Sequence, residues 1–173
     1  MFDKQYDFYG NYATYVEALS QGNKSDDQIY PFRYHWQVYL VAPIIGFQYK
    51  RQAICVDKTK STSVFAEQII NHSSLFKFTY QLIMLLDESY EKDFEKRIEK
   101  AFKILGSPEA KEDELHYDKY VLGGVEYLYN MLIEKGGTTS LFSNIMELLK
   151  EYNSTYNEKN ELSLAQLFKS LKN

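Results

Sequence analysis

The sequence predicts an all-α protein, a compact bundle of about seven helices with at most a minor β element near residues 53–56. Apolar residues recur at helical spacing in one segment of the chain after another. The 173 residues are 45% apolar, which is enough to bury the core of one domain. No internal repeat or low-complexity stretch divides the chain, so we expect a single helical domain over residues 1–173.

Two helices are predicted in the first fifty residues. The first ends the Tyr-rich segment 1–20, where apolar residues recur with helical spacing at Tyr12, Tyr15, Val16 and Leu19. A polar loop over residues 20–27 and an extended entry at Pro31 come next. The second helix covers residues 32–49 and is apolar on nearly all sides, which indicates deep burial. Pro43 is expected to kink or end it, because proline has no amide hydrogen to donate.

The rest of the chain is predicted to be helical at residues 64–70, 75–86, 94–105, 117–133, 141–152 and 164–171. Ser107-Pro108-Glu109 predicts a helix start, since a hydroxyl can cap the helix and proline suits its first position. Gly123-Gly124 lies inside one helix, and Gly136-Gly137 is expected to end it. The last two helices make up a C-terminal part over residues 138–173.

Composition points to a soluble cytoplasmic protein. Cys55 is the one cysteine of the chain, so no intrachain disulfide can form, which fits a reducing compartment. The N-terminus shows no signal-peptide pattern. The longest apolar run, residues 36–47, is shorter than the roughly 20 residues that a membrane-spanning helix needs. The net charge of −4 also argues against a protein built to coat nucleic acid.

No motif for catalysis is present, so we expect no catalytic residue and no cofactor. Cys55 lies between apolar neighbours and is predicted to be a small core residue rather than a nucleophile. Asp87-Glu88 are adjacent, and adjacent helical residues do not face each other, so they predict no acid–base pair. Glu112 and His116 stand four residues apart and could seat a metal, which leaves a metal-dependent hydrolase as a second alternative function.

Residues 29–60 combine basic and aromatic side chains. Within them, basic residues outnumber the one acidic residue, Asp57, five to one: Arg33, Lys50, Arg51, Lys58 and Lys60. Cations pair with phosphates and aromatic rings stack on unpaired bases, so this stretch predicts a nucleic-acid-binding surface. The simpler interpretation is that Lys50-Arg51 follows a helix C-terminus, where cations suit the helix dipole, and that the other cations are solvated. A DNA-binding or DNA-sensing module is therefore the first alternative function.

A protein-binding surface is the leading prediction. Tyrosine and its aromatic relatives are favoured at interfaces, because their rings are apolar and tyrosine has a polar tip. Two glycines inside a helix cost about 1 kcal/mol each relative to alanine, so another backbone must come close to them, either from the same chain or from a partner. The predicted partner-binding residues are Tyr30, Phe32, Tyr34, Trp36, Phe47, Tyr49, Gly123 and Gly124.

The same segments carry a family resemblance. They are, in order, Ile29-Tyr30-Pro31-Phe32, Val38 to Phe47, Lys50-Arg51, Val64 to Ile69, Leu82 to Leu86 and Tyr120 to Leu128. Over residues 29–135 this order resembles the DNA phosphorothioation-associated (Dnd system-associated) protein 4 family, although Pro43 interrupts the apolar helix expected there. The resemblance implies an accessory role in a bacterial DNA-modification or anti-phage defence system, and it implies no catalytic residue. We therefore expect a non-catalytic accessory subunit that binds a larger protein partner.

Overall fold

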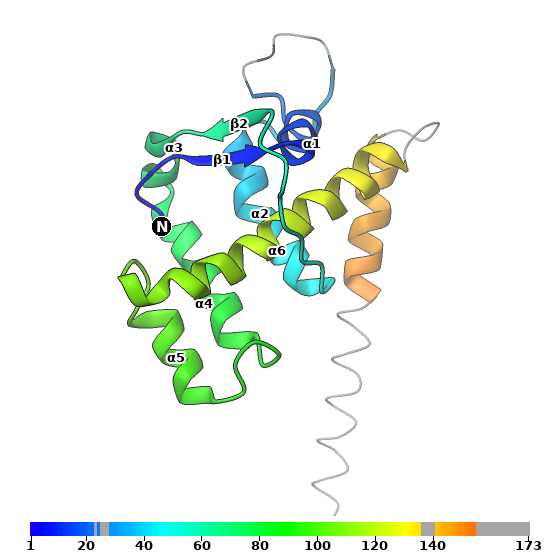
Figure 1. The fold of residues 1–173 in the computed structure, drawn as a ribbon. Helices are drawn as coiled ribbons and strands as arrows, with labels where there is room; N and C mark the ends of the chain where they lie inside the picture. The colour runs from blue at the N-terminus through cyan, green and yellow to red at the C-terminus, as the bar shows by residue number, and fades with distance from the viewer. Residues whose placement is uncertain (23, 25–27, 136–140, 155–173) are drawn as a thin grey trace, which may run out of the picture.

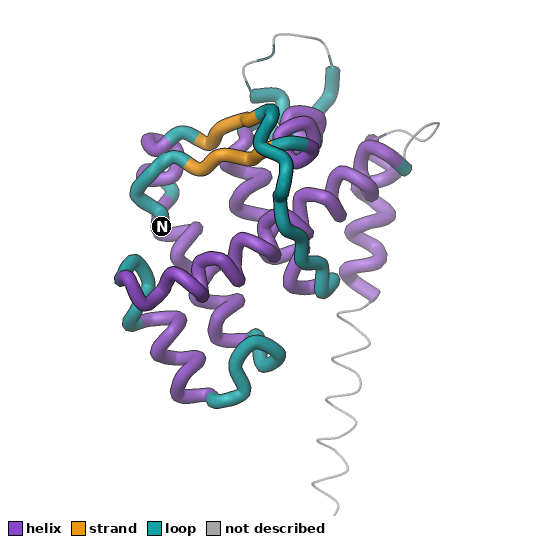
Figure 2. The backbone as a smooth tube through the Cα atoms, viewed as in Figure 1, coloured by secondary structure: helices purple, strands orange, loops and turns teal. Residues whose placement is uncertain are grey.

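The computed structural model describes residues 1–22, 24, 28–135 and 141–154. Within these ranges the chain forms seven α-helices and one small two-stranded sheet, as Figures 1 and 2 show. The all-α class predicted from the sequence is confirmed. None of the helices in these ranges is both long enough and apolar enough to cross a membrane.

Two helices cross at the centre of the molecule and form its most extensive helix–helix contact. They are α2 (His35–Gln48) and α6 (Lys111–Tyr129), and Figure 1 shows α6 running across the molecule over α2. The amides of Arg33 and Tyr34, which precede α2, donate to Oε1 of Gln37 over 2.9 and 3.0 Å, so this helix start is capped from within. The deep burial predicted for this helix holds only in part, because Val38, Tyr39 and Ala42 are buried whereas Ile44 is 38% exposed.

Glycines allow α2 and α6 to approach backbone to backbone. A Cβ atom added to Gly124 would lie 1.8 Å from the carbonyl oxygen of Ala42, and one added to Gly46 would lie 2.2 Å from that of Tyr120. Real Cβ atoms essentially never come within 3.0 Å of another heavy atom. Gly123 and Gly124 are both buried within this chain, and their role in binding a partner stays a prediction. The backbone that comes close to Gly124 belongs to α2.

The sheet consists of β1 (Tyr6–Tyr9) and β2 (Ser61–Val64), which pair antiparallel with Tyr6 opposite Val64. Its inner face buries Phe8 and Val64 completely. The predicted minor β element thus exists, but it does not lie at residues 53–56. That segment is not hydrogen-bonded to either strand as part of the sheet.

The remaining helices pack around this centre. They are α1 (Asn11–Leu19), the short α3 (Ala66–Asn71), α4 (Ser73–Leu86) and α5 (Phe94–Phe102). Asp93 caps α5 by accepting a hydrogen bond from the amide of Lys96 over 3.1 Å. In Figure 1, α5 lies below α6 beside the later part of α4, and α4 and α5 are in extensive contact.

The C-terminal part of the described chain continues from α6. A 3-10 turn (Pro108–Ala110) leads into α6 at the predicted start, and a π-helical turn (Asn130–Glu134) follows it. The helix at 141–154 packs Leu141, Ile145 and Leu148 against the core. Gly136-Gly137 and the predicted helix at 164–171, with most of the C-terminal part 138–173, lie outside the described residues.

Pro43 neither ends α2 nor shortens it. The helix continues through Pro43 to Gln48. Proline removes one helical hydrogen bond. Here Pro43 is itself buried, so packing around α2 holds the helix in place across the missing bond. Val64 also differs from expectation, because it ends β2 and α3 begins only at Ala66.

Aromatic rings form much of the core. Phe2, Tyr39 and Phe76 are buried and pack ring against ring, with centroids 5.7 Å apart for Phe2 and Phe76 and 5.0 Å apart for Tyr39 and Phe76. Burial raises the pKa of Tyr39 and Tyr80 above the usual range, so both stay neutral.

Candidate functional site

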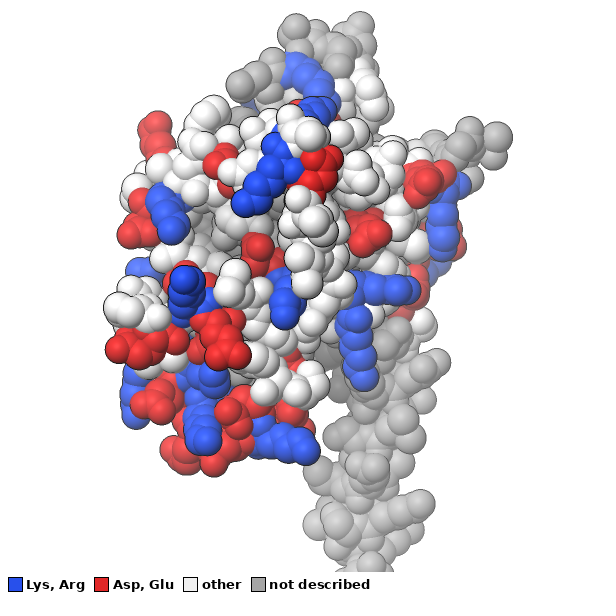
Figure 3. Space-filling model, viewed as in Figure 1, with Lys and Arg blue, Asp and Glu red and all other residues white. Residues whose placement is uncertain are grey.

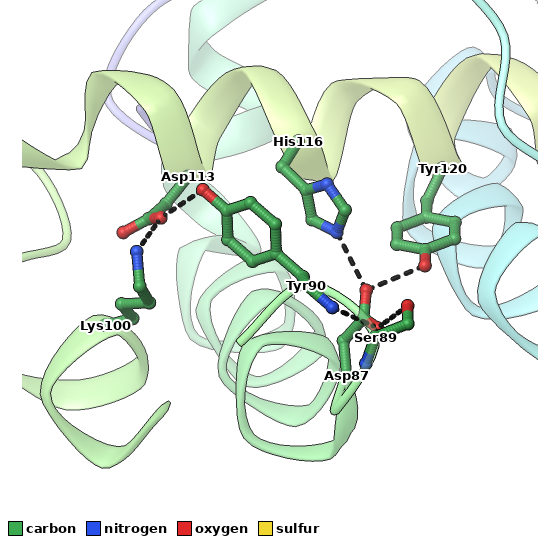
Figure 4. Close-up of polar contacts among 7 residues, drawn as sticks. All are labelled: Asp87, Ser89, Tyr90, Lys100, Asp113, His116 and Tyr120. Carbon is green, nitrogen blue, oxygen red and sulfur yellow. Dashed lines mark hydrogen bonds and ion pairs between the residues drawn. The ribbon is translucent and has the colours of Figure 1, made fainter. Parts of the chain in front are cut away.

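Asp87 is the centre of a buried polar cluster next to α6. It follows the last residue of α4, and only 2% of it is exposed. Its Oδ1 accepts hydrogen bonds from the amide of Ser89 (3.1 Å), the hydroxyl of Ser89 (2.5 Å) and the amide of Tyr90 (3.2 Å). Its Oδ2 accepts the hydroxyl of Tyr120 (2.7 Å) and lies 2.8 Å from Nε2 of His116, as Figure 4 shows.

Helical spacing brings His116 and Tyr120 to the same carboxylate. They stand four residues apart on α6 and therefore share one face of the helix. An ionised carboxylate only accepts hydrogen bonds, so the Nε2 atom of His116 must carry the hydrogen. Burial would raise the pKa of Asp87, but hydrogen bonds from Ser89, His116 and Tyr120 outweigh it and leave that pKa below the usual value.

A second buried carboxylate, Asp113, joins α6 to α5. Its Oδ1 accepts the hydroxyl of Tyr90 at 2.7 Å and the ammonium group of Lys100 at 2.6 Å. The ring of Tyr90 stacks on the imidazole of His116, with centroids 3.7 Å apart. Burial and the hydrogen bond to Asp113 raise the pKa of Tyr90 far above its usual value, so its hydroxyl remains a donor.

These contacts fix the loop between α4 and α5 against α6. Arg97 holds the same loop from α5, because its guanidinium donates to the carbonyl oxygens of Leu85 (2.9 Å) and of Glu91 and Lys92 (3.0 Å each). Both oxygens of Asp87 are already occupied by donors from the chain itself. The arrangement is that of a structural clamp, because neither oxygen is left to serve a reacting group.

A cleft lies beside this clamp, on the face of α6 that turns away from α2. We call it the α6 cleft. It has a volume of about 580 Å³, and its walls are β1, residues 53–55 with Lys58, and α6. Leu115, Lys119 and Leu122 line it from α6, and Tyr6 and Tyr9 line it from β1. Tyr90 and His116 line it as well, so the cleft adjoins the clamp.

The charges of the α6 cleft are of both signs. Asp118 accepts a hydrogen bond from the hydroxyl of Tyr6, and burial raises the pKa of its carboxyl although that hydrogen bond works against the rise. The ammonium group of Lys58 lies 5.6 Å from the ring centre of Tyr9. No ion pair found among the described residues uses Lys58 or Lys119. Figure 3 shows Lys and Arg side chains interspersed with Asp and Glu on this side of the molecule.

The segment 53–58 forms one rim of the cleft and is visible in Figure 2 as an uncoiled stretch that crosses α6. Its side chains alternate: Ala53 and Cys55 are half-buried, whereas Ile54 and Val56 are exposed. Cys55 packs against the core, and its thiol donates to the carbonyl oxygens of Asp57 (3.0 Å) and Tyr9 (3.4 Å). The prediction of Cys55 as a small packing residue is thus confirmed, with half-burial in place of full burial.

The six aromatic residues expected to bind a partner do not form one exposed surface. Tyr30, Phe32, Tyr34, Trp36, Phe47 and Tyr49 are all half-buried. Trp36 stacks on His72 with ring centroids 3.9 Å apart, and Tyr49 stacks on Tyr127 with ring centroids 4.3 Å apart. The first four lie at one end of α2 and the last two at the other, because α2 runs through the centre of the fold. Their role in binding a partner stays a prediction, although no single exposed surface unites them.

Gly123 makes its close contact with the chain just after α2. A Cβ atom added to it would lie 2.2 Å from the carbonyl oxygen of Arg51 and 2.7 Å from the amide nitrogen of Gln52. The amide of Ala53 then donates to the carbonyl oxygen of Lys119 at 3.0 Å. The two glycines of α6 therefore position both α2 and the start of the cleft rim.

The structure does not gather the five predicted nucleic-acid-binding residues into one patch. Arg33 precedes α2, whereas Lys50 and Arg51 follow its other end. The 14 residues of α2 extend over about 21 Å. Lys60 is paired with Glu17 at 2.6 Å, and Lys58 lines the α6 cleft. Lys50 adopts a φ of 52° at the end of α2, where the amide of Arg51 donates to the carbonyl oxygen of Gly46.

The suggested metal pair is also placed differently. Glu112 is exposed at the rim of the α6 cleft, and the Nε2 atom of His116 is engaged by Asp87. Among the residues that the structure describes, no group of three or more His, Cys, Asp or Glu side chains is arranged to hold a metal ion.

Sequence reasoning missed Asp87. It set Asp87 and Glu88 aside because neighbours on a helix do not face each other, yet α4 ends at Leu86 and Asp87 turns inwards. One local signal was present, since an aspartate directly after a long apolar run can bond the amides of the next two or three residues. The rest of the clamp comes from α6, and nothing local in the sequence links it to Asp87.

The comparison with known proteins found no match, so the geometry described above is the basis for assigning a function. No protein-family model, no curated protein and no solved structure matches the chain.

Proposed function

We propose that this protein is a non-catalytic interaction subunit that receives part of a larger protein partner in the α6 cleft. One observation carries the proposal: apolar side chains stand exposed at the edges of a cleft whose walls are largely apolar. Ile54 is 68% exposed on the segment 53–58, and Leu115 is 58% exposed on α6. Covering such side chains is favourable by about 25 cal/mol for each Å² of apolar surface removed from water.

The neighbouring clamp supports a binding role over a catalytic one. His116 lies at the border of the cleft, but Asp87 holds its Nε2 atom and Tyr90 covers its ring. The thiol of Cys55, in the opposite wall, donates to backbone carbonyl oxygens. The imidazole of His116 and the thiol of Cys55 are thus already engaged in holding the walls of the cleft.

The family resemblance gives the proposal its setting. A member of a Dnd-associated family would meet its partner inside a DNA-modification or defence complex. This setting is supported by the sequence segments over residues 29–135 that carry the resemblance, and the binding surface is supported by the geometry of the cleft.

The proposal is tested with a matched pair of variants. Leu115→Lys places a charge in the cleft, whereas Leu75→Lys places one on α4, at a leucine of similar exposure (47%). Tagged chains are expressed in the native host, recovered with a high-salt wash, and their bound proteins are identified. We expect a stoichiometric protein partner with the native chain and with Leu75→Lys, and its loss with Leu115→Lys.

Two results would contradict the proposal. One is a partner that both lysine variants retain equally, because the cleft would then take no part in binding. The other is recovery of nucleic acid that is released as salt rises, which would favour the DNA-binding alternative. Thermal unfolding of both variants shows whether each remains folded.

A further inference from the structure

We infer that the partner includes an extended strand that lies along the rim of the α6 cleft and pairs with the outer edge of the segment 53–58, through main-chain hydrogen bonds with Ile54 and Val56. The inference rests on the proposed function and specifies the chemistry of the partner at the same site. Adding a strand to an exposed edge is an established way in which proteins recognise extended peptides.

The side chains of the rim alternate in the way that such pairing needs. Residues 51–58 contain no turn, bend or helix, and residues 53–55 line the cleft. Side chains of an extended segment point alternately to its two faces. Ala53 and Cys55 pack against the core on one face, and Ile54 and Val56 stand 68% and 91% exposed on the other.

The main-chain groups of the rim also alternate. The amide of Ala53 donates to the carbonyl oxygen of Lys119, which sets the edge of the segment that faces α6. In an extended chain the amides of successive residues point to opposite edges, so those of Ile54 and Val56 point away from that contact. No hydrogen bond found among the described residues uses the amide or carbonyl group of Ile54 or Val56. Both residues therefore offer free donors and acceptors at the outer edge.

The small sheet of the protein does not pair with this edge. β1 pairs with β2, and the amide of Gly10 extends that pairing by donating to the carbonyl oxygen of Lys60 at 2.8 Å. Proteins normally cover or charge an open strand edge to prevent unwanted pairing. Here an exposed valine and an exposed isoleucine lie on the open segment, which favours pairing with a strand.

The charges of the cleft specify the strand further. Among the residues that the structure describes, Lys58 and Lys119 line the cleft without an ion pair, and so does Glu112. The other two carboxylates of the lining accept hydrogen bonds, Asp118 from Tyr6 and Asp7 from Ser63. A strand with apolar residues at alternate positions, to cover Ile54 and Val56, and with an acidic residue to meet Lys58 fits this site.

The test uses the full chain as bait for a phage-displayed library of random twelve-residue peptides. Val56→Pro removes one outer amide, and its ring suits an extended backbone. Val56→Thr is the control, because it keeps the amide and the branched shape. We expect the native chain to enrich acidic peptides with alternating apolar residues. Synthetic copies of these peptides should bind Val56→Pro about tenfold more weakly, and Val56→Thr about as well as the native chain.

Each other outcome has a stated meaning. Peptides that bind Val56→Pro as well as the native chain, but fail to bind Leu115→Lys, overturn main-chain pairing and leave the cleft as a docking site. Peptides that ignore both substitutions, or a library without binders, overturn the strand inference. The co-purification test with Leu115→Lys and Leu75→Lys still judges the proposed function separately. Thermal unfolding of Val56→Pro confirms that the bait is folded, and N-methylation of alternate peptide amides provides a second test that leaves the protein unchanged.

Discussion

The two sides of α6 differ in how their polar and backbone groups are satisfied. On the side facing α2 and the loop after α4, Gly124 meets a backbone of the same chain, and Asp87 receives hydrogen bonds from His116 and Tyr120. On the cleft side, Leu115 is exposed, and the amide of Ile54 takes part in no hydrogen bond among the described residues. The first side holds the fold together, and the second has the features of a binding surface. Substitutions should therefore affect stability on one side and binding on the other.

The largest effect is expected at the helix crossing. Gly124→Ala places a Cβ atom against the backbone of Ala42, and both helices are central, so neither can move away at low cost. We expect a loss of about 3 kcal/mol or more in the free energy of unfolding. Gly106→Ala is the control. Its φ of +85° strains an alanine, but no atom lies within 4 Å of the added Cβ. It should cost only about 1 kcal/mol in urea unfolding. Equal losses for the two variants would contradict the close approach of α2 and α6.

A smaller but still large effect is expected at the clamp. Asp87→Ala leaves the buried donors of His116, Tyr120 and Ser89 without their acceptor. We expect a loss of about 2–3 kcal/mol in urea unfolding. The neighbouring carboxylate provides the control: Glu88 is exposed and pairs with Arg97 at 3.3 Å. Glu88→Ala should cost no more than about 0.5 kcal/mol. If Asp87→Ala were as mild as Glu88→Ala, Asp87 would not hold the loop.

Asp87 and Asp118 lie on different sides of α6, and their contributions to stability should change with pH in opposite directions. The pKa of Asp87 is lowered in the folded state, so its contribution is present above the unfolded pKa of about 3.9 and is lost as pH falls through the folded pKa. The pKa of Asp118 is raised by burial, so its ionised form destabilises the fold at neutral pH, and this penalty is relieved as pH falls.

Asparagine variants test this difference. Asp87→Asn should lower the melting temperature at neutral pH and reduce the further loss of stability below about pH 4. Asp118→Asn keeps an oxygen for Tyr6 and should raise the melting temperature at neutral pH, with the gain shrinking in acid. Calorimetry across the pH range measures both effects. Shifts of the same sign for both variants would remove the distinction between the two carboxylates.

The smallest effect on stability is expected in the cleft itself. Leu115→Lys changes an exposed side chain, so the free energy of unfolding should change by no more than about 0.5 kcal/mol, as for Leu75→Lys. A large loss of stability for Leu115→Lys alone would mean that Leu115 supports the fold, and that its exposure does not mark a binding surface.

Local periodicity predicted much of the fold. For example, α5 contains the four apolar residues whose helical spacing predicted it: Phe94, Ile98, Ala101 and Phe102. The glycine pair of α6 also indicated a close backbone approach, although the sequence left open whether the backbone belonged to a partner or to α2. Strand β1 was missed because its partner is distant: Tyr6 pairs with Val64, and the whole of α1 and α2 lies between them in the sequence.

The functional surface depended on contacts that sequence spacing does not encode. Asp87 meets His116 and Tyr120 across 29 and 33 residues of chain. The aromatic and basic residues around α2 are close in sequence, but the helix separates them in space. By contrast, the alternation of Ala53, Ile54, Cys55 and Val56 was visible as an extended segment. That it lies as an unpaired rim beside a cleft follows from the contact between Ala53 and Lys119.

The central claim, that α6 carries a satisfied side and an open side, is tested most directly by amide hydrogen exchange in the free protein. The amide of Ala53 is bonded to the carbonyl oxygen of Lys119, and no hydrogen bond found among the described residues uses the amides of Ile54 and Val56. We predict slow exchange at Ala53 and at the centre of α6, and exchange close to that of an unfolded chain at Ile54 and Val56. Protection of Ile54 and Val56 equal to that of Ala53 would show that the edge is already paired, and would contradict the account.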